Sequence, residues 1–160
     1  MKILAIDPGY ERLGIAVLEK LPRQKEILLY SECFKTSAKI PHHERLTLIG
    51  NKIKETIEKF SPEVLATEKL YFSNNQKTAL LVAEARGVIL YAASSNGLHV
   101  FEYTPACIKI AVTGYGKSEK RQIIDMVKKL IVVPKGKSSD DEFDAIAIGL
   151  THFAINKADK

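Results

Sequence analysis

Two apolar segments of this sequence each end in a carboxylate. Residues 3–6 are apolar and lead into Asp7, after which a Pro-Gly pair predicts a turn, and the segment Val64–Glu68 ends in the same way at Glu68. Both segments have the length and composition of buried strands. A carboxylate at the rim of a core loses hydration free energy unless it is paired, hydrogen-bonded or bound to a metal ion. Asp7 and Glu68 are therefore candidates for a functional site.

Two further acids, Asp141 and Asp144, lie three positions apart in the last predicted helix. This spacing places their side chains on one helix face, with about 5–6 Å between the Cβ atoms. Four acids that share one cleft raise one another's pKa unless a cation neutralises them. No cluster of His or Cys accompanies them in the sequence, and ligands that are all oxygen atoms favour the hard cations Mg²⁺ or Mn²⁺. Two such ions would suit phosphodiester cleavage.

Each acid also has a purely structural interpretation when it is taken alone. Asp before Pro-Gly commonly stabilises a turn, and Glu68 suits an ion pair with Lys69 or with a nearby Arg. The first turn of the last helix is acidic over residues 140–142, where carboxylates favour the helix dipole, and we expect the cap residue among residues 138–140. The metal interpretation therefore depends on the four acids together.

The hydrophobic pattern predicts an α/β domain with a mixed five-stranded sheet flanked by helices. Apolar and alternating segments predict strands at Lys2–Asp7, 14–18, 26–34, Val64–Glu68 and His99–Tyr103. Helical periodicity predicts helices over 41–60 and 75–94, a helix that begins at Pro105, and helices over 119–132 and 140–156. The three consecutive strands predict a meander, and the later alternation with helices predicts parallel strands. A right-handed crossover would then bring Asp7 and Glu68 to one edge of the sheet, within a single domain of residues 1–160.

The composition is that of a basic globular chain. A formal net charge of +5 and an apolar content of 46% are compatible with a polyanionic partner but do not identify one. Cys33 and Cys107 are too few and too far apart for a disulfide framework or a thiolate metal site. No apolar segment is long enough for a membrane span and no signal peptide pattern is present, so we expect a cytoplasmic protein without membrane contact.

Six short motifs, spread over nearly the whole chain, match one known family in its order. They are Ile6-Asp7-Pro8-Gly9 with Gly14, Ala66-Thr67-Glu68, Ala85-Arg86-Gly87, Phe101-Glu102-Tyr103, the Gly-Tyr-Gly-Lys-Ser-Glu-Lys of residues 114–120, and the Asp-Glu-Phe-Asp-Ala-Ile-Ala-Ile of residues 141–148. In these residues the sequence resembles RuvC, a family of Holliday junction resolvases with a ribonuclease H-like fold.

The resemblance implies a homodimeric crossover junction endodeoxyribonuclease that acts in DNA recombination and repair. Such an enzyme nicks two opposed strands of four-way junction DNA symmetrically, leaves 5′-phosphate and 3′-hydroxyl ends, and uses two Mg²⁺ ions per subunit, for which Mn²⁺ is a possible substitute. The residues that match the family's catalytic and metal-binding acids are Asp7, Glu68, Asp141 and Asp144. The resemblance also implies the branch-migration proteins RuvA and RuvB as partners.

One segment departs from the RuvC pattern. Residues 11–16 lack the Gly-Tyr-Gly usual after the first acid and resemble instead the YqgF-type putative resolvases. A YqgF-type RNA-processing nuclease is therefore one alternative. A non-catalytic junction-binding protein is another, although it would not need all four acids. Sugar-kinase and actin-type ATPases share the fold but require a second phosphate loop and a longer, two-lobed chain than 160 residues provide.

Five residues are predicted to contact DNA. Tyr71 matches a family aromatic residue that stacks on an unpaired base near the cut, a contact worth about 1–3 kcal/mol. Lys109 and Lys120 match positions that the family uses near the DNA backbone, and Lys117 and Arg121 extend this basic group. Such side chains bind phosphates without reading sequence. The alternatives are core packing for the aromatic residue and solvation for the basic ones.

The predicted helix over residues 78–93 is apolar nearly all round. A helix on the surface of a monomer needs only one apolar face, so part of this surface would stay exposed. Either the helix is central and covered within the monomer, or a second copy covers it. The two-fold symmetry of a junction with two equivalent strands favours a homodimer through residues 78–93.

Overall fold

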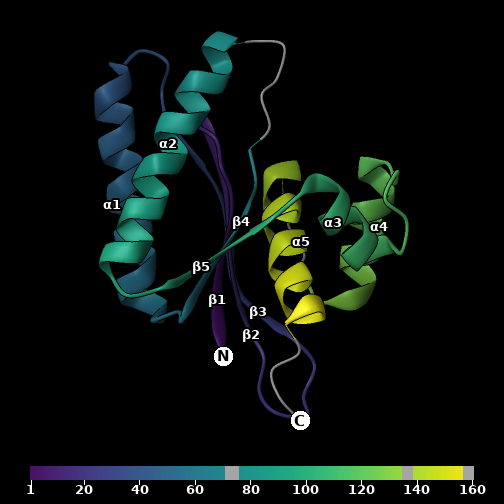
Figure 1. Ribbon diagram of the computed structural model, residues 1–160. Coiled ribbons are helices and arrows are strands. Elements are labelled where there is room, and N and C mark those ends of the chain that lie inside the picture. The colour runs from purple at the N-terminus through teal and green to yellow at the C-terminus, as the bar shows by residue number, and fades with distance from the viewer. Residues whose placement is uncertain (71–75, 135–138, 157–160) are drawn as a thin grey trace.

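The computed structural model describes residues 1–70, 76–134 and 139–156. It contains a five-stranded sheet with helices on both faces (Figure 1). The strands are β1 (Lys2–Asp7), β2 (Arg12–Glu19), β3 (Ile27–Lys35), β4 (Val64–Glu68) and β5 (His99–Tyr103). The helices are α1 (His42–Phe60), α2 (Gln76–Ser95), α3 (Pro105–Thr113), α4 (Lys120–Leu130) and α5 (Asp140–Ile155). The predicted α/β class with a mixed five-stranded sheet is confirmed.

The strand order is β3-β2-β1-β4-β5. β1 pairs antiparallel with β2, and β2 pairs antiparallel with β3, which confirms the predicted meander. β4 pairs parallel with β1, and β5 pairs parallel with β4. Because β1 and β4 run in the same direction, their last residues, Asp7 and Glu68, lie at the same edge of the sheet, as the crossover argument predicts.

Successive residues of the central strands face opposite helical layers. Ile3 and Ala5 of β1 pack in the core beneath α5, α3 and α4, whereas Leu4 and Ile6 pack in the core beneath α1 and α2. Figure 1 shows the two helical layers on either side of the sheet. Strand side chains alternate between faces, so Asp7 continues the row of Ile3 and Ala5 and faces α5. The same alternation in β4 directs the last acid of that strand toward α5.

The largest differences from the predicted element bounds are at β2 and α4, whereas the ends of the other elements differ by at most one residue. β2 begins at Arg12 and not at Gly14, because Arg12 already pairs with Lys35 of β3 although it interrupts the apolar pattern. α4 is shorter at both ends than the predicted 119–132, because Glu119 caps the helix and Ile131 has extended backbone geometry. The extra two residues of β2 matter because they place an arginine beside the acidic residues.

Local hydrogen bonding explains where α5 begins. The Ser139 hydroxyl accepts a hydrogen bond from the Glu142 backbone N–H, and the Glu142 carboxylate accepts one from the Ser139 N–H at 3.0 Å. This reciprocal pair is a capping box, so the predicted cap is confirmed at Ser139. None of the helices in the described ranges is long and apolar enough to cross a membrane.

Candidate active site

Asp7 carries a partly buried carboxylate that has no ion-pair partner among the described residues. Asp7 ends the central strand β1, and no hydrogen bond or ion pair joins its side chain to another described residue. Burial raises its pKa to about 8, and the charges of Asp144, Glu68 and Asp141 act in the same direction. At pH 7 the protonated form of this carboxyl group therefore predominates unless a cation binds it.

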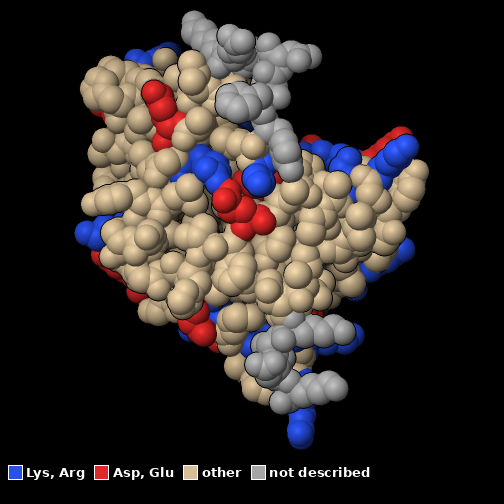
Figure 2. Space-filling model, viewed as in Figure 1, with Lys and Arg blue, Asp and Glu red and all other residues tan. Residues whose placement is uncertain are grey.

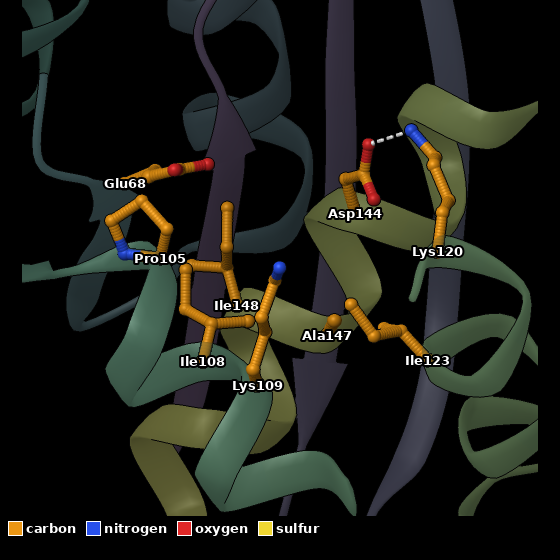
Figure 3. A pocket seen from close by; sticks show the side chains of 9 residues that line it. All are labelled: Glu68, Pro105, Ile108, Lys109, Lys120, Ile123, Asp144, Ala147 and Ile148. Carbon is orange, nitrogen blue, oxygen red and sulfur yellow. Dashed lines mark hydrogen bonds and ion pairs between the residues drawn. The ribbon is translucent and has the colours of Figure 1, made fainter. Parts of the chain in front are cut away.

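Glu68 and Asp144 face one another across a cavity of about 250 Å³. Burial raises the pKa of Glu68, and the nearby charge of Asp144 adds to the shift. Burial also raises the pKa of Asp144, although Lys120 opposes it by donating a hydrogen bond from Nζ to Asp144 Oδ2 at 2.5 Å. Figure 3 shows this pair and Lys109, whose side chain points into the space between the two acids. A second cavity, lined by Asp7 and Glu68, adjoins it through Glu68.

Asp141 is engaged with a different part of the sheet. Arg12 donates to Asp141 Oδ2 from Nε at 2.8 Å and from Nη2 at 2.6 Å, and the Cys33 thiol lies 3.4 Å from the same oxygen. Burial opposes ionisation of this carboxyl group, but the hydrogen bonds from Arg12 and Cys33 outweigh it and hold its pKa below the usual value. Asp141 lines neither of the cavities that Glu68 lines.

Gly14 permits the close approach of α5 to β1 and β2. A Cβ atom at this position would lie 2.1 Å from the Asp141 carbonyl oxygen and 3.1 Å from the Asp7 Cβ. Any side chain here would push the first turn of α5 off the sheet. Glycine at this position therefore brings the helix that carries Asp141 and Asp144 next to the strand that ends in Asp7.

The four acids fit a hard cation in chemistry but do not enclose one in this conformation. Within residues 1–70, 76–134 and 139–156, no group of three or more His, Cys, Asp and Glu side chains is arranged to hold a metal ion. Two acids already have a cation from the chain, since Lys120 contacts Asp144 and Arg12 contacts Asp141. Asp7 and Glu68 have no ion-pair partner in the described part of the chain and are partly desolvated oxygen donors, which is the ligand type that Mg²⁺ and Mn²⁺ prefer.

The predicted DNA-contacting residues differ in their placement. Lys109 and Lys120 line the cavity beside Glu68 and Asp144. Lys117 and Arg121 are exposed and lie outside that cavity lining. Figure 2 shows acidic side chains grouped in the middle of the viewed face with basic side chains directly beside them. Tyr71 lies outside the described residues.

Arg12 and Cys33 are contacts that the sequence reasoning missed. Arg12 lies two residues before Gly14 on β2, and Cys33 of β3 is the residue that pairs with Gly14. A period of two along β2 places Arg12 on the face toward α5, as it places Asp7 on β1. This alternation was present in the sequence, but it points to Arg12 only when β2 is predicted to begin at residue 12.

Tyr10, in the turn just before the segment that departs from the family pattern, is held in place by Thr36 and by Arg45 of α1. Thr36 Oγ1 donates a hydrogen bond to the Tyr10 carbonyl at 2.5 Å and accepts one from Arg45 Nε at 2.9 Å. The Arg45 guanidinium lies 4.9 Å from the centre of the Tyr10 ring, and Arg45 is only 6% exposed. These contacts fix the turn between β1 and β2 and thereby the position from which Arg12 reaches α5.

The sequence comparisons give one family. A family model described as crossover junction endodeoxyribonuclease RuvC matches residues 3–152. The RuvC protein of Moorella thermoacetica is 43% identical over 152 residues, which cover 95% of this chain and 90% of that protein. The RuvC protein of Desulforamulus reducens is 40% identical over 152 residues, which cover 95% of this chain and 93% of that protein.

Solved structures agree with the sequence comparisons. The structure of T. thermophilus RuvC in complex with a Holliday junction substrate matches with a TM-score of 0.90 and 33% identity, and the match covers 97% of this chain and 94% of that one. The yeast mitochondrial Holliday junction resolvase Ydc2 matches with a TM-score of 0.71 at 15% identity, covering 95% of this chain and 78% of that one, which supports the fold alone. The ribonuclease H-like fold expected from the resemblance is confirmed.

Proposed function

The chain belongs to the RuvC family of crossover junction endodeoxyribonucleases, and we propose on this basis that it resolves Holliday junctions at a centre built from Asp7, Glu68, Asp141 and Asp144. The observation that supports this assignment is the carboxylate of Asp7, which lies beside Glu68 and has no ion-pair partner within residues 1–70, 76–134 and 139–156; the cavity lined by Asp144 and two lysines adjoins it.

Asp7 and Glu68 would hold the first divalent cation, and Asp144 and Asp141 would complete a two-ion centre, with Mg²⁺ as the expected ion and Mn²⁺ as a substitute. When bound, such ions supply activation of a water and stabilisation of the leaving oxygen in phosphodiester hydrolysis. The chain's own residues prepare that centre. Asp7 gives up its proton when it takes a cation, because its pKa lies near 8 only while it is unpaired. Gly14 holds α5 close enough for its acids to participate.

The basic residues would hold the DNA backbone over the acids. Lys109 and Lys120 are the strongest candidates, because both line the acidic cavity and would contact the phosphates next to the cut. The exposed Lys117 and Arg121 would extend the contact along the backbone. Tyr71 is proposed to stack on an unpaired base at the branch point, on family resemblance alone.

A homodimer through α2 would place two such centres on one junction. Leu80 is 65% exposed and Tyr91 is 76% exposed, and their spacing of eleven residues places them on the same face of the helix. A two-fold contact between α2 helices would cover both side chains. Leu80→Glu combined with Tyr91→Glu is expected to convert a dimer into a monomer in light scattering. We also propose RuvA and RuvB as partners, which co-purification on a junction would test.

A junction-cleavage assay tests the proposed function. Mobile and static synthetic four-way junctions are incubated with the protein, with and without Mg²⁺, and the nicks are mapped on all four strands. Symmetric nicks on two opposed strands are expected, only with the metal ion. Asp7→Asn should abolish nicking and keep junction binding, whereas Asp125→Asn, an exposed acid on α4, should leave nicking unchanged. Full activity of Asp7→Asn would remove the proposed centre.

A further inference from the structure

Asp141 differs from the other three acids in the direction of its carboxylate. Its contacts are Arg12 on β2 and Cys33 on β3, which lie on the opposite side of β1 from the strand β4 that carries Glu68. Asp141 lines neither of the cavities that contain Glu68, whereas Asp144 lines one of them. One turn of helix therefore presents two acids in two directions, and only Asp144 faces Glu68.

Three donors converge on a single oxygen of this carboxylate. Nε and Nη2 of Arg12 lie 2.8 Å and 2.6 Å from Asp141 Oδ2, and the Cys33 thiol lies 3.4 Å from it. Charge-assisted hydrogen bonds of this kind fix the orientation of a carboxylate. A guanidinium carries the same sign of charge as a metal ion, so at this position it opposes cation binding by Asp141.

We propose that Arg12 is a latch that holds the Asp141 carboxylate toward β2 and β3 in the metal-free enzyme, and that a divalent cation gains Asp141 as a ligand only when Arg12 releases it. Cys33 assists by donating to the same oxygen. The proposal rests on the proposed function, since it assumes that Asp141 belongs to the metal centre. Arg12 is a positioning residue in this scheme, because it acts through Asp141.

The exposure of the pair sets the strength of the latch. The Arg12 side chain is 49% exposed and the Asp141 side chain is 22% exposed. Ion pairs that solvent reaches to this extent are weak, so the latch changes the apparent affinity for a divalent cation by about 2- to 5-fold. It is therefore readily reversible. The brace of Arg45 and Thr36 on Tyr10 holds the backbone of the turn, so release needs only a change of the Arg12 side chain.

Calorimetric titration of the DNA-free protein with Mn²⁺ tests the latch without using activity. Arg12→Gln should bind Mn²⁺ about 2- to 5-fold more tightly than the wild type. Arg12→Lys, which keeps the charge but loses the two-donor contact, should lie between them. Lys35→Gln is the matched control, because it removes the same charge from an exposed residue that pairs with Arg12 across the two strands. The control should leave the affinity unchanged.

A second pair of variants separates the latch from a general charge effect. In an Asp141→Asn background, Arg12→Gln should no longer change the Mn²⁺ affinity, because there is no carboxylate to release. Three results would each overturn the latch and leave the proposed function standing. They are unchanged or weaker binding of Mn²⁺ by Arg12→Gln alone, an equal gain in affinity from Lys35→Gln, and a gain from Arg12→Gln that persists in the Asp141→Asn background. Absence of Mn²⁺ binding by the wild type and by Arg12→Gln would overturn both.

Discussion

Replacing Asp7 by Asn should make the metal-free protein more stable than the wild type by an amount that grows with pH. The pKa of Asp7 rises from 3.8 to about 8 in the folded protein, chiefly because of burial. Between pH 5 and pH 7 the folded state therefore keeps a proton on Asp7 that the unfolded chain has lost. Stability that depends on this proton is complete below pH 3.8 and is lost as the pH rises toward 8.

The size of this stability difference follows from the one extra proton that the folded protein binds at Asp7. A difference of one bound proton changes the free energy of unfolding by about 1.4 kcal/mol per pH unit. The wild type should thus lose about 3 kcal/mol relative to Asp7→Asn between pH 5 and pH 7. Urea denaturation in the presence of EDTA, followed by circular dichroism at pH 5, 6 and 7, measures the difference directly.

Two comparisons make this measurement decisive. Asp125→Asn should follow the wild type at every pH, because Asp125 is exposed. With Mg²⁺ added at pH 7, the wild type should gain stability and Asp7→Asn should gain much less, because a ligand stabilises only the state that binds it. If the stabilities of Asp7→Asn and the wild type run parallel from pH 5 to pH 7 in EDTA, then folding does not raise the pKa of Asp7.

Three further substitutions test other parts of the structure. Gly14→Ala should slow junction nicking by about 100-fold, because the new methyl group would lie 2.1 Å from a backbone oxygen of α5 and displace the helix. The far-ultraviolet circular dichroism spectrum should stay native. A wild-type nicking rate would show that this close approach of α5 is not needed. Lys109→Gln should reduce by about one the slope of log affinity against log salt for junction binding, whereas Lys129→Gln on the exposed surface of α4 should not. Tyr103→Phe removes the 2.8 Å hydrogen bond to buried His152 and should lower the free energy of unfolding in urea by about 1–3 kcal/mol. Equal urea midpoints for the variant and the wild type would mean that another group hydrogen-bonds the histidine.

Strand patterning predicted the part of the site that lies on the sheet. Asp7 and Glu68 each follow an apolar segment, and parallel pairing of those segments was enough to bring both to one edge facing α5. The cap at Ser139 was equally local, because its partner lies only three residues away. The partners of Asp141 were not predictable in the same way, since Arg12 is 129 residues distant and its contact depends on how α5 lies over β2.

The sequence also did not predict which side chains of α2 are exposed. The nearly all-apolar sequence of residues 78–93 was compatible with a buried central helix or with an interface. The structure buries Ala85 and Ile89 against the sheet and leaves Leu80 and Tyr91 exposed. Composition alone does not distinguish these positions, because the direction of each side chain is set by packing against α1 and the sheet.

The four acids also divide by the element that carries them. The strand acids Asp7 and Glu68 have no ion-pair partner among the described residues, and their raised pKa values show that their ionisation is disfavoured. Each of the helix acids Asp141 and Asp144 has a basic side chain that neutralises it, from Arg12 on β2 or Lys120 on α4.

This division explains how a metal-free chain tolerates four carboxylates at one sheet edge. Protonation relieves the repulsion at Asp7, and two chain cations relieve it on α5. In the proposed centre, a divalent cation would displace a proton on the strand side and compete with a basic side chain on the helix side. Raising the pH toward 8 should strengthen cation binding by the strand acids, whereas removing Arg12 should strengthen binding at Asp141 at any pH in this range.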